Sequence, residues 1–168
     1  MKLIVVYQSS TGFTKQYAEW IAQALNVEVI SNKDSAKINV ADYDAVIFGG
    51  WIMGNTIMGL DKLKQRNPKK LIVFACGSSE MSEETVNTIL ELNKLGDVPF
   101  FYMPGGFKFD QLNFFVRFML KKMKKSVAKK ENKTEQDRYM EKVLGTNFDI
   151  SDRKYIEPLV AYYKREEK

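Results

Sequence analysis

Four hydroxyl side chains and one glycine lie within six residues near the start of the chain. The segment consists of Ser9, Ser10, Thr11, Gly12, Phe13 and Thr14. A hydrophobic run precedes it and an amphipathic pattern follows it, so the segment leads into the first turn of a predicted helix. The N–H groups of a first turn have no partners within the helix, and the helix dipole makes them electropositive. This arrangement predicts a site for a phosphate monoester.

The same segment contains no lysine or arginine, so an anion would be held by hydrogen bonds and by the helix dipole. It lacks the Gly-Lys-Ser/Thr ending of nucleoside triphosphate loops and the Gly-x-Gly-x-x-Gly pattern of dinucleotide sites. The alternative interpretation is an ordinary capped helix start, because serine and threonine are good N-caps. A cap requires one hydroxyl group, so the presence of four favours the phosphate site.

The composition limits the chemistry that side chains can perform. The 168 residues include no histidine and a single cysteine, Cys76. An internal disulfide is thereby excluded, and a structural zinc site is disfavoured. Histidine is also the commonest general base, so we expect no catalytic side chain, no metal site, and chemistry that belongs to a cofactor.

Predicted strands and helices alternate along the first two thirds of the chain. Apolar runs predict strands, and apolar residues at spacings of three and four predict helices. The predicted strands are residues 2–7, 27–30, 44–50, 70–77 and 98–103, and the helices between them are 14–25, 57–66 and one that begins at 82. This alternation predicts an α/β fold, a doubly wound sheet of five parallel strands with helices on both faces. Ligands bind such sheets beyond the carboxyl ends of the strands.

Two further loops follow predicted strands and therefore belong to the same edge of the sheet. The first contains Gly50, Trp51, Ile52, Met53, Gly54 and Asn55. The second contains Cys76, Gly77, Ser78 and Ser79. Trp51 lies between glycines at the end of a strand, which favours stacking on a ligand over packing on its own helix. Cys76 ends a buried strand, so a small core residue is its better interpretation.

Together the three loops resemble the flavin site of the flavodoxins. Residues 9–14 resemble their phosphate loop, [T/S]-x-T-G-x-T, which holds the 5′-phosphate of FMN. Residues 49–55 resemble their second flavin loop, where an aromatic or apolar residue stacks on the isoalloxazine ring, and residues 76–79 resemble the third. The resemblance covers residues 1–104. It implies bound FMN, a flavodoxin-like sheet of strand order 2-1-3-4-5, and electron transfer through the flavin.

The chain beyond residue 104 resembles a narrower branch of that fold. Residues 104–108 and 117–124 look like the branch that contains menaquinone-dependent protoporphyrinogen dehydrogenase. This likeness implies an oxidoreductase linked to a quinone or a porphyrinogen, with peripheral membrane contact. Two departures from electron-carrier flavodoxins agree with an enzyme: the net charge is +5, and residues 76–81 include no tyrosine to cover one flavin face. A non-enzymatic electron-transfer protein, with a redox protein as partner, is the alternative.

The C-terminal third is expected to form a basic, helical extension of a single flavodoxin-like domain. Residues 105–168 hold 16 Lys/Arg and 10 Asp/Glu. The expected core consists of residues 1–104 and a last helix at 151–165. The expected insertion, residues 105–150, contains helices at 111–125 and 134–145 and a flexible lysine-rich segment at 126–134. No signal peptide or membrane-spanning run is recognised, so we expect a cytoplasmic protein, peripheral at the inner face of the membrane if the insertion binds lipid.

The predicted helix at 111–125 allows two interpretations. Its apolar side is formed by Leu112, Phe115, Met119, Leu120 and Met123. Burial against the sheet is the default for such a stripe. Phe114 and Phe118 widen the apolar arc and lysines flank it, so binding to a membrane surface through residues 111–130 is an equal alternative. A homodimer could use the same broad apolar helix, whereas no nucleic-acid-binding motif is present.

Overall fold

The computed structural model describes residues 1–78 and 82–166. The chain divides into two compact units. The larger unit comprises Met1–Gly105 and the chain from Ser151 onward, and the smaller unit comprises Gly106–Ile150. The larger unit contains the predicted sheet and all candidate site residues that the structure describes.

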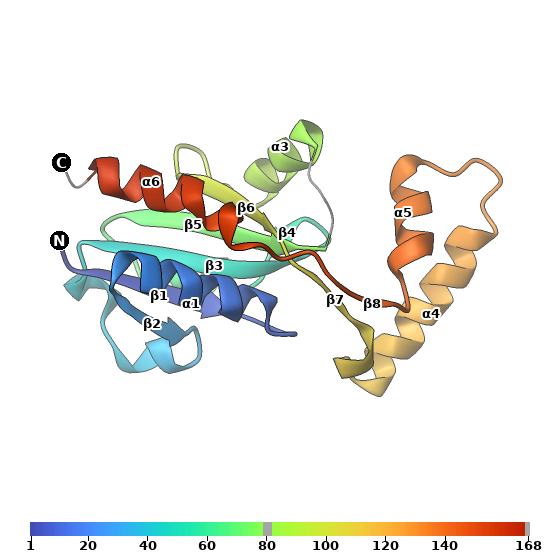
Figure 1. Ribbon diagram of the computed structural model, residues 1–168, viewed down its shortest axis with the longest axis horizontal. Coiled ribbons are helices and arrows are strands. Elements are labelled where there is room, and N and C mark those ends of the chain that lie inside the picture. The colour runs from blue at the N-terminus through green and yellow to red at the C-terminus, as the bar shows by residue number, and fades with distance from the viewer. Residues whose placement is uncertain (79–81, 167–168) are drawn as a thin grey trace. The chain divides into compact units, whose positions relative to one another are not determined.

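Five parallel strands form the centre of the larger unit (Figure 1). They are β1 (Leu3–Gln8), β2 (Glu28–Ser31), β3 (Ala45–Met53), β5 (Leu71–Gly77) and β6 (Phe100–Pro104). A two-residue strand, β4 (Thr56–Ile57), pairs antiparallel with β3. The parallel strands are ordered β2-β1-β3-β5-β6, which is the predicted order 2-1-3-4-5 once β4 is left out of the count. The predicted doubly wound sheet is therefore confirmed.

Helices cover both faces of this sheet. One face carries α1 (Phe13–Leu25), the short 3-10 helix η4 (Arg153–Ile156) and α6 (Glu157–Glu166). The other face carries α2 (Leu60–Lys64), α3 (Glu83–Leu92) and the 3-10 helices η1 (Asp34–Lys37) and η2 (Val40–Asp42). The sequence of strand β1 is continuously apolar because both of its faces are buried. Leu3 and Val5 belong to one core cluster, and Ile4 and Val6 belong to the other. Alternate residues of a strand face opposite sides, so a strand covered twice needs apolar residues throughout.

The smaller unit is a helical hairpin on a two-stranded ribbon. Its elements are β7 (Gly106–Lys108), the 3-10 helix η3 (Phe109–Gln111), α4 (Phe114–Ala128), α5 (Glu135–Val143) and β8 (Asn147–Asp149). β7 pairs antiparallel with β8, and α4 packs against α5. A capping box between Thr134 and Asp137 starts α5. No helix in the described ranges 1–78 and 82–166 is long and apolar enough to cross a membrane.

The helix that was predicted at 111–125 begins and ends later in the chain than predicted. Helix α4 begins at Phe114, because the side-chain oxygen of Asn113 accepts the Val116 N–H at 2.9 Å and caps the helix there. It continues to Ala128, into the segment that was expected to be flexible. Strands β7 and β8 were not predicted, since three residues are too few to show a strand period.

Candidate functional site

The register of the sheet brings the three predicted loops to one edge. The pairs at this edge are Tyr7 with Gly49, Gln8 with Gly50, Trp51 with Cys76, and Gly77 with Pro104. The candidate residues at 9–14, 50–55 and 76–78 therefore follow or end adjacent strands. The remaining candidate, Ser79, lies outside the described residues.

The segment after β1 turns into α1 at Gly12, whose φ of 96° lies in the left-handed region. Residues with a side chain rarely adopt such a φ, so glycine suits this turn. The Gly12 N–H donates to Ser9 Oγ at 3.1 Å, which closes the loop. Among the described residues no side chain caps α1, and its first turn holds no acidic residue. The start of this helix is therefore chemically suited to an anion.

Three hydroxyl groups of this loop make no hydrogen bond to any residue within 1–78 or 82–166. They belong to Ser10, Thr11 and Thr14. Ser10 is exposed and Thr11 is half-buried, whereas the Thr14 residue is only 1% exposed. A hydroxyl group can donate one hydrogen bond and rotates to suit its acceptor. All three can therefore donate to the oxygens of an anion bound at the start of α1.

Two candidates of this edge are packing residues. Phe13 and Cys76 are buried in the core cluster beneath α1 and α6, as the core interpretation of Cys76 predicts. A Cβ on the neighbouring Gly105 would lie 2.5 Å from Cys76 Sγ and 3.1 Å from Phe13 Cβ. These residues therefore fix how closely the end of β6 approaches α1, and they present no reactive group to a ligand.

The second loop is a β-hairpin, which corrects the prediction that its strand ends at Gly50. Strand β3 runs on to Met53, which pairs with Thr56 of β4. Gly54 and Asn55 have φ angles of 55° and 64°. Two successive left-handed residues characterise the type I′ turn of a tight hairpin.

The hairpin also shortens the helix that was predicted at 57–66. Ile57 belongs to β4, and helix α2 begins only at Leu60 and ends at Lys64. Gly59, with a φ of 87°, separates the two elements. The sequence pattern did not reveal the hairpin, because a Gly-Asn pair reads equally well as part of an open loop.

Trp51 is half-buried, yet neither core cluster of the described residues includes it. Its neighbour Ile52 packs against the cluster beneath α2 and α3, so the alternation of a strand places Trp51 on the α1 face. The Trp51 carbonyl accepts the Met58 N–H at 2.9 Å, which holds this backbone in place. An aromatic ring on a fixed backbone without core partners is suited to stacking on a planar ligand.

Asn93 fixes the hairpin and was not predicted from the sequence. Its side-chain oxygen accepts the Ile57 N–H at 2.7 Å, and its amide nitrogen donates to the Asn55 carbonyl at 2.8 Å and to the Ile89 carbonyl at 2.7 Å. The residue is buried at the end of α3. An asparagine that ends a helix is common, so no sequence signal distinguishes this one.

Two tyrosines shape the rest of the edge. A Cβ on Gly77 would collide with the ring and the hydroxyl group of Tyr102, so a larger residue there would require Tyr102 to move. The Tyr17 hydroxyl group donates to the Pro104 carbonyl and accepts the Asp152 N–H at 3.2 Å. Tyr17 thereby joins the end of β6 to the chain that leads into α6.

A cavity of about 580 Å³ adjoins the site on the α2 face. It is lined by Gln8, Asn32, Lys33, Ala36, Thr56, Ile57, Met58, Gly59, Asp61 and Lys62. Gln8 ends β1, and its side-chain oxygen accepts a hydrogen bond from Asn32 at 3.1 Å. The segment that follows the hairpin thus forms one wall of this cavity.

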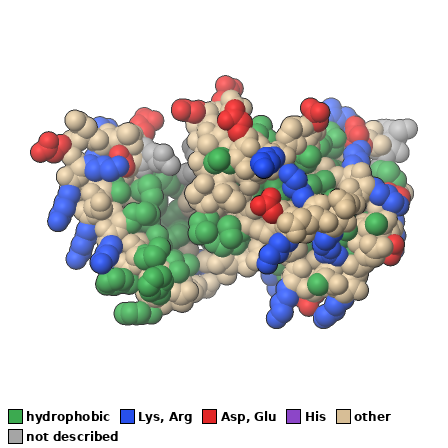
Figure 2. All heavy atoms as spheres, turned by 180° about the vertical axis from the view of Figure 1, so that it is seen from behind, with side chains coloured by type: hydrophobic (Ala, Val, Ile, Leu, Met, Phe, Trp, Pro, Cys, Tyr) green, Lys and Arg blue, Asp and Glu red, His purple; other side chains and the backbone are tan. Residues whose placement is uncertain are grey.

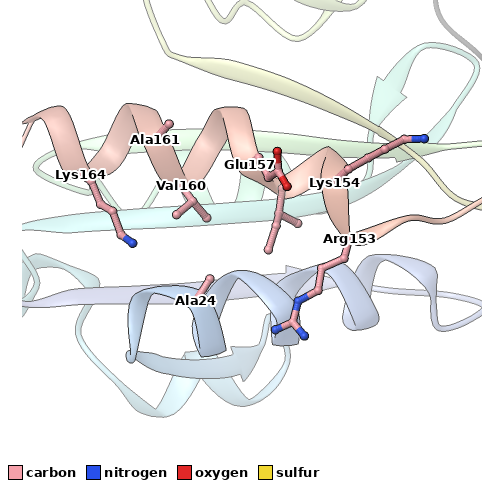
Figure 3. Close-up of a pocket in the computed structure, with 8 residues that line it drawn as sticks. Ala24, Arg153, Lys154, Glu157, Val160, Ala161 and Lys164 are labelled. Atoms are coloured by element: carbon pink, nitrogen blue, oxygen red, sulfur yellow. The ribbon is translucent and has the colours of Figure 1, made fainter.

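A second cavity, of about 450 Å³, lies between α1 and α6 (Figure 3). Its walls include Ala24, Val160 and Ala161, and Arg153 reaches across to donate to Gln23 of α1. Ala24 belongs to the last turn of α1, at the opposite end from Gly12. This cavity is therefore not part of the candidate site. Across the described residues, no group of three or more His, Cys, Asp or Glu side chains could hold a metal ion.

The sheet order and the glycine-bearing edge define an α/β protein of the doubly wound class. The family described as "Flavodoxin domain" matches residues 4–135. The chain is also 34% identical over 116 residues to a flavodoxin of Maridesulfovibrio salexigens, covering 58% of this chain and 80% of that protein. This chain therefore belongs to the flavodoxin family.

Solved structures that are similar to this chain include the following two examples. One is a flavodoxin from the domain Archaea, with 28% identity, coverage of 61% of this chain and 78% of that chain, and a TM-score of 0.43. The other is a flavoprotein in complex with FMN from Lactobacillus acidophilus, with 15% identity, coverage of 60% and 90%, and a TM-score of 0.43.

Proposed function

We propose that this protein binds FMN at the carboxyl edge of its sheet and transfers electrons through it. Membership of the flavodoxin family supports the cofactor. The observation that carries the proposal is the start of α1, where the helix is uncapped and three hydroxyl groups make no bond to the described residues. The 5′-phosphate of FMN is an anion of the size and charge that this loop can bind.

Residues 9–14 contain no lysine or arginine, so this loop would bind the phosphate through hydrogen bonds and the helix dipole. Ser10, Thr11 and Thr14 would donate their hydroxyl hydrogens to its oxygens, and the N–H groups of the first turn of α1 would donate beside them. Gly12 has no side chain, so the backbone of this turn could approach the phosphate closely, and glycine also tolerates the left-handed φ found there. Bound FMN supplies the redox chemistry through its flavin ring.

The flavin ring is held by the other two segments. Trp51 offers its aromatic face, and the hairpin that carries it is held by the side chain of Asn93. Gly77 and Ser78 lie at the end of β5, the strand next to the one that carries Trp51. The complete set of residues proposed for the flavin site is Ser9, Ser10, Thr11, Gly12, Phe13, Thr14, Gly50, Trp51, Ile52, Met53, Gly54, Asn55, Cys76, Gly77, Ser78 and Ser79. In this set Phe13 and Cys76 contribute packing, because their side chains are buried in the core.

FMN titration tests the proposal directly. FMN fluorescence is expected to be quenched by the purified protein, and Thr14→Val is expected to weaken binding about tenfold or more, because one hydrogen bond to a charged group is lost. Thr88→Val is the matched control, since Thr88 is half-buried on α3 and its hydroxyl group donates to the Glu84 carbonyl, outside the candidate site. Unquenched FMN with the folded wild-type protein would contradict the proposal.

For the electron partner we propose a quinone or a porphyrinogen, which makes the protein an oxidoreductase. The exposed apolar and basic surface of the smaller unit supports this proposal over a pure electron carrier, because an apolar surface suits an apolar reductant or oxidant. Stopped-flow mixing of the reduced protein with a quinone tests it. Rapid oxidation is expected, whereas slow oxidation by the quinone and rapid oxidation by a redox protein would favour the carrier.

A further inference from the structure

Helix α4 exposes large apolar side chains in its first two turns. Phe114, Phe115, Phe118 and Met119 are 78%, 68%, 48% and 52% exposed. These four residues are called the apolar tip below. Figure 2 shows hydrophobic side chains gathered on the surface of the smaller unit, with Lys and Arg side chains next to them. Single exposed apolar residues are ordinary on protein surfaces, whereas a contiguous group marks an interaction site.

The apolar tip is not the side by which α4 packs within its own unit. Val127 is buried, and Val116 and Leu120 are half-buried. At 100° per residue these three lie within about 40° of one another around the helix, away from Phe114 and Phe118. The stripe predicted from the sequence is therefore divided, because Leu120 belongs to the half-buried side whereas Phe115 and Met119 are exposed.

The second half of α4 carries the charge. Residues 111–130 contain Arg117, Lys121, Lys122, Lys124, Lys125, Lys129 and Lys130, and no Asp or Glu. Lys121, Lys122, Lys125 and Lys129 are exposed, and these four are called the lysine cluster below. Lys122 Nζ lies 4.9 Å above the Phe118 ring, at the junction between the apolar tip and the lysine cluster.

The charge of the whole chain is concentrated in the smaller unit. Residues 106–150 hold 11 Lys/Arg and 6 Asp/Glu, a net charge of +5, which equals the net charge of the whole chain. The larger unit is consequently neutral by formal count. A surface that is both apolar and cationic is complementary to an anionic partner with an apolar interior.

We propose that α4 docks the protein on an anionic lipid surface. The apolar tip enters the boundary between headgroups and acyl chains, and the lysine cluster contacts the anionic headgroups. No helix of the described residues can span a bilayer, so the contact is peripheral. Lysines next to the apolar residues agree with this geometry, because their long stems reach headgroups while the phenylalanines go deeper.

A second copy of this chain is a poorer occupant of the same surface. A twofold interface brings the same patch of both subunits together. Here the exposed lysines of one copy would face those of the other, and residues 111–130 contain no Asp or Glu to pair with them. Like charges at an interface oppose association.

Co-sedimentation of the full chain with vesicles tests the proposal. We expect binding to vesicles of phosphatidylcholine mixed with phosphatidylserine, weaker binding at high salt, and little binding to phosphatidylcholine alone. Replacing the four lysines of the lysine cluster by glutamine is expected to weaken binding at least about tenfold, since each basic residue contributes about fivefold near an anionic leaflet. The matched control replaces Lys15, Lys37, Lys69 and Lys94, which are exposed on the larger unit away from the candidate site.

A second variant tests the apolar tip. Phe114→Ser with Phe118→Ser is expected to reduce vesicle binding while circular dichroism remains unchanged, because both side chains are exposed. Leu92→Ser, at an exposed apolar residue of α3, is expected to bind as the wild type does. Equal binding to both kinds of vesicle, unchanged binding of both α4 variants, or a dimer that the Phe variant dissociates would each overturn the proposal. FMN affinity, measured on the same variants, is expected to stay unchanged and reports separately on the flavin site.

Discussion

Gly105 sets the distance between the end of β6 and the first turn of α1. Its missing side chain leaves room for the sulfur of Cys76 and for the ring of Phe13, which are both buried. The close approach matters for the site, because Phe13 is the first residue of the helix that would bind the phosphate. Packing at this residue and the geometry of the loop are therefore coupled.

Gly105→Ala is expected to destabilise the protein by about 1–3 kcal/mol, as overpacking of a filled core does. The added carbon would lie 2.5 Å from Cys76 Sγ, which is too close for any real contact. Urea unfolding followed by circular dichroism measures the loss. In a Cys76→Ala background the same substitution is expected to cost less, because the colliding sulfur is gone. An identical loss in both backgrounds would show that the sulfur is not the obstacle.

The β3–β4 hairpin is stabilised by a residue outside the hairpin, Asn93. Only two pairs of residues join β3 to β4, and an isolated hairpin of that size is marginal. Asn93, at the end of α3, satisfies both the Ile57 N–H and the Asn55 carbonyl. The position of Trp51 is therefore linked to the position of α3.

Asn93→Ala is expected to cost about 1–3 kcal/mol in the free energy of unfolding, because it leaves buried backbone groups of the hairpin without their partner. It is also expected to weaken FMN binding, since the hairpin loses its support. Urea unfolding and FMN titration measure the two effects. Asn132→Ala, at an exposed position of the smaller unit, serves as the control and should change neither. A stable Asn93→Ala protein with unchanged FMN affinity would contradict this role of Asn93.

Helix α5 depends on a carboxylate at its start. Hydrogen bonds from Lys130 and from the Thr134 N–H hold the pKa of Asp137 below its ordinary value of 3.8. A carboxyl group whose pKa is lower in the folded state stabilises the fold above its ordinary pKa, and this contribution is lost as the pH falls toward the folded value. The stabilising effect of Asp137 is thus fully present at neutral pH.

The difference in thermal midpoint between the wild-type protein and Asp137→Asn is therefore expected to be largest near neutral pH and to shrink in acid, below the ordinary pKa of 3.8. Thermal unfolding followed by circular dichroism at several pH values checks this. Asp149→Asn, in the same unit but outside the capping box, is the control. A difference that stays constant from neutral pH into acid would mean that Asp137 does not act through its charge.

The parallel strands and α1 could be predicted from the sequence, whereas the hairpin and the exposed side of α4 could not. The positions of the parallel strands along the chain and the start of α1 follow from local patterns, because each buried strand is continuously apolar and the hydroxyl groups come directly after the first. The order of the strands in the sheet was predicted from the resemblance to the flavodoxins. The hairpin depends on contacts with Asn93, 36 and 38 residues away, which leave no local trace. The exposed side of α4 could not be assigned either, since apolar residues occur on several sides of that helix.

On the scale of the whole molecule, the core of the larger unit is independent of the smaller one. Every residue of the two core clusters lies in Met1–Gly105 or beyond Ser151. The two chain ends at which the smaller unit is attached lie close together, because the Tyr17 hydroxyl group bonds both the Pro104 carbonyl and the Asp152 N–H. The insertion can therefore be removed without separating strands or helices of the sheet.

Replacing residues 106–150 with a short Gly-Ser linker is expected to leave a folded α/β unit that still binds FMN. The expected result follows from the intact core clusters and from the location of the candidate residues 9–14, 50–55 and 76–78 in the larger unit. Circular dichroism, thermal unfolding and FMN titration measure it. A truncated protein that does not fold would show that the smaller unit supplies stability that the core clusters do not reveal.

The central claim is that residues 9–14 bind the phosphate of FMN, and a comparison of FMN with riboflavin tests it most directly. Both ligands carry the same flavin ring, and only FMN carries the phosphate. Titration of the wild-type protein is expected to give a dissociation constant for FMN at least about a hundredfold lower than for riboflavin, because several hydrogen bonds to a charged group are lost with the phosphate. Equal affinity for the two ligands would contradict the assignment of this loop.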